Sequence, residues 1–486
     1  MTRHRRNVAY NLLGYAVPLA LSLLTIPLYL SLLGLERFGV LQMAWVFLGY
    51  FGVLDLGLGK ATAYFLAKPD GEAASGREVL YTSLAMSVGI GLLIGAVFYL
   101  IAILFFGALF QVPDALRAEV LPVLPVLALA VPVGVLTSTY SAALQGRGQF
   151  LTVNVLGTGS TILFQLAPLA VALLVAPTLT LIVPVAIGAR LLGLVAYGAA
   201  CTRVIGAPGR GLVSTRTMRA LMGYGGWAAV SSLLAPMLQL ADRMSIGAVL
   251  GAAAVATYTI PIQFAQRMTV LPSSVALALF PKLVGATAEE RTRIVRENMN
   301  GMGALLLAVL AVAIPIFPEF LRVWLGSHYQ PSLGTTAVVL LVGFFFNGLA
   351  LYPCIQLQAS GAPRKIAESY AYQIPVYFGL LYLLMRLFGV EGAAMALAAR
   401  FGIDLVLLYT FANRRWPPRE LWVQTVALMA VVGAASLLPL TPAGMGTMAT
   451  CSALALAAAV ATAPKRMRDQ ASQMAAKLTR RRATAV

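Results

Sequence analysis

Long apolar segments recur along the whole 486-residue chain and leave no stretch large enough for a separate soluble domain. A helix needs about 20 apolar residues to cross a bilayer, and windows of that length give fourteen expected spans. They lie at 9–33, 38–67, 79–106, 119–144, 151–176, 180–202, 220–250, 252–281, 299–325, 333–360, 366–388, 391–412, 420–440 and 445–463. Since a helix satisfies its own backbone hydrogen bonds in lipid, the pattern predicts an all-α polytopic membrane protein.

The distribution of charge predicts how these spans are oriented. The formal net charge is +18, which in a soluble protein would suggest a nucleic-acid partner. Here 26 basic residues fall in one set of alternating loops and 4 in the other, Arg37, Arg117, Arg322 and Arg386. Basic residues of short loops stay on the cytoplasmic side. We therefore expect both termini to be cytoplasmic and no nucleic-acid partner.

Three basic segments belong to the expected cytoplasmic set. They are the 203–219 loop, the 282–298 loop and a tail at 464–486 that carries seven basic residues and one aspartate. The tail has the composition of a segment that docks on anionic lipid, although a solvated tail without a partner is the alternative. The basic start of the chain precedes a long apolar run and further spans, so we interpret it as an uncleaved first helix.

A weak internal repeat divides the chain. A shift of 217 positions aligns Leu33 and Gly34 with Leu250 and Gly251, each pair lying in a short outer turn between two spans. Transporters are often built from such repeats. The expected division is a first lobe at 1–216 with helices 1–6, a second lobe at 217–414 with helices 7–12, two additional helices at 415–463 and the basic tail.

No enzyme or metal motif emerges from the sequence. The run from Gly57 to Thr62 superficially matches a phosphate loop, but position 54 is Leu and position 61 is Ala where that motif needs Gly and Ser or Thr. The two histidines, His4 and His328, lack the spacing of metal ligands. We therefore expect a protein that is not an enzyme and that needs no cofactor and no metal.

Basic residues inside the spans are the candidate site. Arg190, Arg267 and Arg400 come to about 15, 22 and 14 Å below the outer surface at about 1.5 Å per helical residue. Arginines near mid-membrane are costly and face a bundle interior or a water-filled cavity. The three arginines are therefore predicted to bind an anionic substrate, with pairing inside each lobe as the structural alternative.

Five other charged residues lie in the interior of the expected spans, more than six residues from either end: Asp55, Lys60, Asp242, Arg243 and Asp404. Each carboxylate is a candidate for ion coupling or for a structural ion pair. Asp404 stands one helical turn from Arg400, which favours a pair between them, and Asp242 adjoins Arg243.

The first two spans carry a recognisable pattern. It consists of Asn11, Gly14 and Pro27, then Leu33-Gly34-x-Glu36-x-Phe38-Gly39, then Asp55-Leu56-Gly57-Leu58-Gly59. The second lobe carries Asp242-Arg243, Leu250-Gly251, Tyr258 and Phe280-Pro281. Over about 1–414 this resembles the oligosaccharide flippases (Wzx-like) of the polysaccharide transporter family, within the multidrug/oligosaccharidyl-lipid/polysaccharide superfamily. Lys60 stands near where many members carry an arginine.

The resemblance implies two lobes around a central cavity and a role in cell-surface polysaccharide biosynthesis, such as O-antigen, lipopolysaccharide or exopolysaccharide. The expected substrate is a polyprenyl-pyrophosphate-linked oligosaccharide moved from the cytoplasmic to the outer leaflet of a bacterial inner membrane. Expected partners are membrane lipid and possible polysaccharide polymerases or glycosyltransferases.

Two alternatives stay open. One is a cation-coupled drug or metabolite antiporter of the same superfamily, and the other is a membrane polysaccharide polymerase or ligase. Away from the span ends, basic residues outnumber acidic ones by five to three, which favours an anionic cargo.

Overall fold

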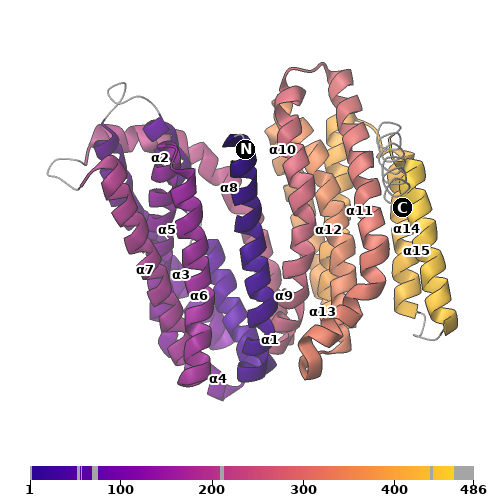
Figure 1. Cartoon of the computed structure of the whole chain (residues 1–486), viewed down its shortest axis with the longest axis horizontal. Coiled ribbons are helices and arrows are strands. Elements are labelled where there is room, and N and C mark those ends of the chain that lie inside the picture. Colours follow the sequence, from indigo (N-terminus) through magenta and orange to yellow (C-terminus); the bar gives the residue numbers. More distant parts are fainter. Residues whose placement is uncertain are drawn as a thin grey trace, which may run out of the picture. The chain divides into compact units, whose positions relative to one another are not determined.

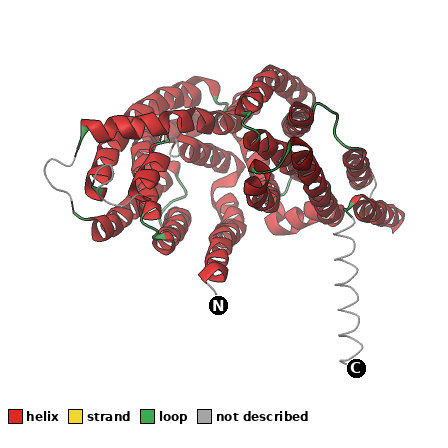
Figure 2. Ribbon diagram, turned by 90° about the horizontal axis from the view of Figure 1, so that it is seen from above, coloured by secondary structure: helices red, strands yellow, loops and turns green. Residues whose placement is uncertain are grey.

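The computed structural model of the chain describes residues 3–51, 55, 57–67, 75–207, 213–437 and 442–464. All of these residues lie in helices or in the loops between them, and none lies in a strand (Figure 2). The prediction of an all-α protein is confirmed. Most of the basic tail, 465–486, lies outside the described residues. The chain forms two compact units, Met1–Ala256 and Thr257–Val486.

Unit 1 is a bundle of long helices with three short helical elements (Figure 1). In chain order it contains α1 (Arg3–Phe51), α2 (Leu58–Ala67), α3 (Gly76–Leu104), a π-helical turn η1 (Phe105–Leu109), α4 (Asp114–Val120), a 3-10 turn η2 (Leu121–Val123), α5 (Leu124–Gly146), α6 (Phe150–Leu174), α7 (Leu179–Ile205), α8 (Thr215–Leu250) and the first residues of α9 (Ala252–Ala265).

Unit 2 continues from α9 with helices that run side by side in Figure 1. It contains the 3-10 turn η3 (Gln266–Thr269), α10 (Val270–Val284), α11 (Ala288–Leu325), the 3-10 turn η4 (Gly326–His328), α12 (Pro331–Ala359), α13 (Pro363–Asn413), α14 (Arg419–Leu437) and α15 (Pro442–Thr462). Both α14 and α15 pack against α11, so the two additional helices are part of this unit.

Nine helices of the described residues are long and apolar enough to cross a membrane. The segment Arg364–Asn413 counts once among them, although it contains two of the expected spans. The outward faces carry the apolar side chains that lipid requires: on α3 alone Leu92, Leu93, Val97, Leu100 and Leu104 are exposed. An apolar surface on this scale identifies a membrane-embedded bundle.

Single glycines reverse the chain inside α1 and α13. Gly34 has φ 72° and ψ 172°, and Gly389 has φ 60° and ψ −132°, conformations that side chains with a Cβ rarely adopt. The rings of Tyr29 and Phe38, on either side of Gly34, lie 6.3 Å apart. Both glycines fall at expected boundaries between spans, so α1 and α13 each hold two spans.

Gly251 of the expected repeat has the same backbone conformation as Gly34. Its φ is 86° and its ψ is −178°, at the end of α8. The compact units, however, divide 40 residues after the expected lobe boundary at 216, because α8 packs against α1, α2 and α3. The repeat-based division at 216 concerns internal symmetry and stays a prediction.

Candidate functional site

Arg190 lies on an aromatic platform in unit 1. Its guanidinium carbon is 4.5 Å from the ring centroid of Phe164, and that ring is 4.8 Å from the ring of Trp45. The three residues come from α7, α6 and α1, which pack together. No carboxylate within 4.0 Å pairs with Arg190 among the described residues. The aromatic face stabilises its charge by cation–π attraction and leaves its N–H groups able to bind an anion.

Arg400 is in a comparable setting in unit 2. It is buried at 7% exposure, and its guanidinium carbon lies 5.1 Å from the Tyr377 ring centroid and 5.6 Å from the Phe401 ring centroid. Both units thus hold an arginine on an aromatic face rather than against a carboxylate. Such an arginine keeps its charge and its forked geometry for a ligand.

Asp404 takes its hydrogen bonds from the other half of α13. Its Oδ1 accepts from Gln373 Nε2 at 2.7 Å and from Ser369 Oγ at 3.2 Å, and Gln373 also donates to Ser369 at 2.7 Å. No ion pair joins it to Arg400 within 4.0 Å in the described chain. The structure therefore gives Asp404 amide and hydroxyl donors, and the charge of Arg400 acts on it from beyond ion-pair distance.

Arg267 differs from the other two candidate arginines. It lies in η3, where the helix between α9 and α10 tightens, and its side chain is exposed. Among the residues that the structure describes, Arg267 forms no ion pair within 4.0 Å. A 3-10 interruption inside a membrane helix is a common mark of a functional position.

Asp55 caps the start of α2. Its Oδ1 accepts from the backbone N–H of Gly57 at 3.0 Å, and its Oδ2 accepts from the N–H of Gly59 at 3.0 Å and from Ser138 Oγ on α5 at 3.1 Å. A Cβ on Gly59 would lie 2.5 Å from the Asp55 carboxylate, and Gly57 has φ 75°. The Asp-Leu-Gly-Leu-Gly segment is therefore a capping structure in which each glycine is sterically required. Lys60 follows, exposed, in the first turn of α2.

Asp242 and Arg243 are both buried in α8, at 1% and 4% exposure. Asp242 Oδ1 accepts from the backbone N–H of Arg243 at 2.7 Å and lies 3.9 Å from the Arg243 guanidinium. Asp242 and Arg243, which are adjacent in the sequence, thus form a buried pair of opposite charges. Removing one partner of such a pair lowers the stability of the protein.

A strongly basic pocket lies at the helix ends of unit 2, where sequence reasoning placed only loops. It has a volume of about 660 Å³ and is formed by the start of α11, the end of α12 and both ends of α13. Its lining includes six basic side chains and one carboxylate, Glu289. The basic residues are Arg291, Arg293, Arg296, Lys365, Arg414 and Arg415.

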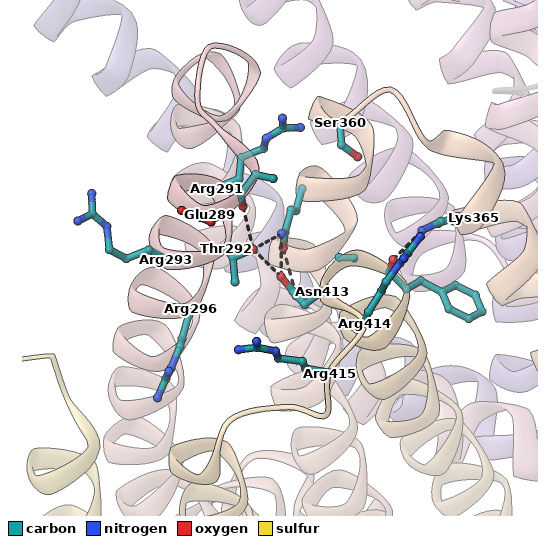
Figure 3. Close-up of a pocket in the computed structure, with 14 residues that line it drawn as sticks. Glu289, Arg291, Thr292, Arg293, Arg296, Ser360, Lys365, Asn413, Arg414 and Arg415 are labelled. Carbon is teal, nitrogen blue, oxygen red and sulfur yellow. Dashed lines mark hydrogen bonds between the residues drawn. The ribbon is translucent and has the colours of Figure 1, made fainter.

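A hydrogen-bonded network joins the helices that line this pocket. Asn413 Oδ1 accepts from Thr292 Oγ1 at 2.9 Å and from Gln356 Nε2 at 2.9 Å. In the close-up of Figure 3 the Arg291 side chain lies above this network and the Arg415 side chain below it. Because Thr292, Gln356 and Asn413 belong to α11, α12 and α13, the network fixes the helix ends that carry the basic residues.

The basic residues of this pocket are visible in the sequence, but their arrangement around one cavity is not. Its basic residues were assigned to three separate cytoplasmic loops and used only for orientation. Their convergence depends on the reversal of α13 at Gly389, which brings Asn413 back to the level of Lys365. That contact, from Lys365 Nζ to the Phe411 carbonyl, measures 2.9 Å.

Solved structures of membrane transporters share this fold. The chain aligns with a lipid II flippase, MurJ, in an inward closed conformation at a TM-score of 0.69 and 12% identity, covering 93% of this chain and 98% of that one. It aligns with an inward-facing multidrug resistance MATE family transporter of the MOP superfamily at a TM-score of 0.64 and 16% identity, covering 86% and 98%. The chain therefore has the fold of a polytopic membrane transporter.

Sequence comparison gives the family. Residues 4–286 match the model of the polysaccharide biosynthesis protein family, and the chain belongs to that family. A putative O-antigen transporter of Shigella flexneri is 27% identical over 419 residues, which are 84% of this chain and 97% of the relative. The family assigned from the first two spans is thus confirmed, together with the multi-pass membrane character of the chain.

Proposed function

We propose that the protein is a flippase for polyprenyl-pyrophosphate-linked oligosaccharide, moving it from the cytoplasmic to the outer leaflet of a bacterial inner membrane. The observation that carries this proposal is the pair of arginines, Arg190 and Arg400, each on an aromatic face inside an apolar bundle and without a carboxylate partner within 4.0 Å among the described residues. A diphosphate matches the forked donors of arginine. The relation to a putative O-antigen transporter supports the same substrate class.

The proposed binding residues are Arg190, Arg267 and Arg400. The first two differ in their surroundings, since Arg190 is held against Phe164 whereas Arg267 is exposed. An arginine near the bilayer centre costs about 2.5–3.5 kcal/mol on insertion scales, which argues for a functional reason to keep it there. The aromatic rings position the guanidinium groups without neutralising them.

Outward movement of the substrate needs no nucleotide in this proposal. A diphosphate with about two negative charges is driven outward by an inside-negative potential, worth roughly 2.3 kcal/mol per charge per 100 mV. Asp55 and Asp404 remain candidates for ion coupling, although their hydrogen bonds give both a structural role. Polymerases and glycosyltransferases of the same biosynthesis are the proposed partners.

The proposed orientation places both termini in the cytoplasm. Three of the four basic residues on the expected outer side have carboxylate partners: Arg37 with Glu119 at 2.6 Å, Arg117 with Asp114 at 3.3 Å and Arg322 with Glu319 at 3.7 Å. The fourth, Arg386, lies over the Tyr382 ring at 5.4 Å.

A cation-coupled antiporter is the second candidate, because a MATE family transporter shares the fold. Purified protein in liposomes distinguishes the two functions. The flippase should move a lipid-linked oligosaccharide between leaflets without changing it covalently, and replacement of a chromosomal flippase by this gene should restore surface glycan. Efflux of organic cations without any lipid movement would favour the antiporter, and covalent change of the lipid-linked donor would favour a polymerase or ligase.

A further inference from the structure

The basic pocket of unit 2 has more positive charge than its own carboxylates balance. Arg296 pairs with Glu420 at 3.0 Å, and Arg293 lies 3.9 Å from Glu290. Lys365 donates to a backbone carbonyl. Arg291, Arg414 and Arg415 have no ion pair within 4.0 Å among the described residues, and their charges share the pocket with Glu289 alone. Like charges brought together around one cavity repel unless an anion enters it.

Two of these three arginines also carry local strain or an unmet bond. Arg291 has a buried Nε without a hydrogen-bond partner, and a buried donor of this kind costs free energy when it stays unbonded. Arg414 has φ 55°, a left-handed conformation that glycine or asparagine adopts more easily. The unbonded Nε of Arg291 is thus a donor that a bound anion would satisfy.

Membrane topology does not explain this arrangement. The positive-inside rule requires basic residues on the cytoplasmic side but not their convergence on one cavity. In unit 1 the residues Arg203, Arg216 and Arg219 belong to the same expected cytoplasmic set, and their side chains are exposed and do not line this pocket. These three arginines serve as a matched control, because they carry the same charge and do not line the pocket.

We propose that this pocket is a binding site for the phosphate groups of an anionic lipid at the cytoplasmic ends of α11 and α13. Phosphate oxygens accept forked hydrogen bonds from arginine, and the three arginines that line this pocket offer such donors to phosphate groups. Two lipids supply that chemistry: the diphosphate of the proposed substrate, bound before it is carried, and the phosphodiester of an ordinary anionic membrane lipid. The inference rests on the proposed function for the first source and on the proposed orientation.

Protection of a single cysteine measures occupancy of this pocket directly. Ser360 lines the pocket and is exposed, so Ser360→Cys in a chain with Cys201, Cys354 and Cys451 changed to Ala reports on it by maleimide labelling. The exposed Ser327 of η4, changed to cysteine in the same background, is the control. The full-length protein is placed in nanodiscs of neutral phosphatidylcholine and titrated with inorganic pyrophosphate, farnesyl diphosphate or phosphatidylglycerol.

Phosphate ligands should slow the labelling of Ser360→Cys and leave that of Ser327→Cys unchanged. Adding Arg291→Gln, Arg414→Gln and Arg415→Gln should raise the half-protecting concentration at least about tenfold, since each lost charge-assisted hydrogen bond weakens binding. Replacing the same arginines by Lys, which keeps the charge and checks folding, should raise it less. The matched Arg203→Gln, Arg216→Gln, Arg219→Gln variant should behave as wild type.

The order of ligands identifies the source of the phosphate. Protection at the lowest concentration by farnesyl diphosphate assigns the pocket to the substrate, and protection first by phosphatidylglycerol assigns it to membrane lipid. Unprotected Ser360→Cys, or equal half-protecting concentrations in wild type and the Gln variant, would overturn the proposal. Since no transport is measured, the result is independent of the flippase assay.

Discussion

The guanidinium group of Arg190 lies over the ring of Phe164, 4.5 Å from its centroid, as that of Arg400 lies over Tyr377 at 5.1 Å. Each contact joins neighbouring segments of one unit, α6 with α7 in unit 1 and the two halves of α13 in unit 2. An arginine held by an aromatic face is oriented without being neutralised. Mutation of either partner therefore has separable consequences for binding and for packing.

Replacement of Arg190, Arg267 or Arg400 by Ala should abolish surface glycan, and replacement by Lys should impair it. Each Ala variant loses charge-assisted hydrogen bonds worth about 1.5–3 kcal/mol, which is roughly tenfold or more in binding. Lys keeps the charge but lacks the forked donors. The measurement is glycan display in cells that lack their own flippase, with membrane levels checked. Full display by all three well-expressed Ala variants would rule out these arginines as the substrate site.

Substitution of the aromatic partners should impair transport less than substitution of the arginines. Phe164→Leu keeps an apolar side chain but removes the ring under Arg190, and we expect reduced transport of lipid-linked oligosaccharide in liposomes with near-normal thermal stability. The cation–π contact is worth about 0.5–2 kcal/mol. Leu163, exposed on the same helix, gives the matched control Leu163→Ala. Equal transport by Phe164→Leu and wild type would show that the ring serves packing only.

We expect the main role of Asp55 to be structural, as the cap of α2. Asp55→Ala removes the acceptor for Gly57, Gly59 and Ser138, and an N-cap change of this kind costs about 0.5–2 kcal/mol. Asp55→Asn retains an acceptor oxygen and should recover part of the stability. Thermal unfolding in detergent gives the comparison. If Asp55→Asn is as stable as wild type but transport loses its dependence on a pH gradient, the carboxylate takes part in coupling instead.

Asp404 should respond to changes in its amide partner. Gln373→Leu removes the 2.7 Å donor and leaves a buried carboxylate with Ser369 as its remaining donor, so unfolding should become easier by about 1.5–3 kcal/mol. The double change Gln373→Leu, Asp404→Leu should recover most of that loss, because the buried carboxylate that lacks its donor is removed. Independent, additive effects in the two single variants and the double variant would contradict the direct bond.

Topology is testable at two described positions of unit 2. An outside, membrane-impermeant maleimide should label Ser327→Cys in intact cells and spare Ser360→Cys, since the positive-inside rule puts the loop after α12 in the cytoplasm. Permeabilised cells should label both, which controls for accessibility. Labelling of Ser360→Cys in intact cells would reverse the orientation proposed for the whole chain.

The fold was largely predictable because hydropathy and single glycines are local signals. The expected span boundaries near Gly34 and Gly389 match the two chain reversals, and the all-helical class is confirmed. Side-chain partnership was less predictable. Spacing alone paired Asp404 with Arg400, whereas tertiary packing gives Asp404 the donors Gln373 and Ser369, which precede it by 31 and 35 residues in the 51-residue α13.

The site residues Arg190, Arg267 and Arg400 stay a prediction from the sequence, and the surroundings of Arg190 and Arg400 could not be predicted from it. Phe164 and Tyr377 are ordinary apolar residues of their spans until the helices pack. The basic pocket was missed for the converse reason, because residues spread from Arg291 to Arg415 meet only after α13 reverses.

The chain reversal at Gly389 folds α13 into a hairpin whose two halves contact each other along their length. Its two halves touch near the turn, where a Cβ on Gly392 would strike the Leu384 carbonyl, then at Arg400 with Tyr377, at Asp404 with Gln373, and at the open end through Lys365 and Phe411. The two halves of this hairpin are therefore joined at several points along its length. Arg400 and the pocket residue Lys365 belong to the same hairpin, and Arg414 and Arg415 directly follow it.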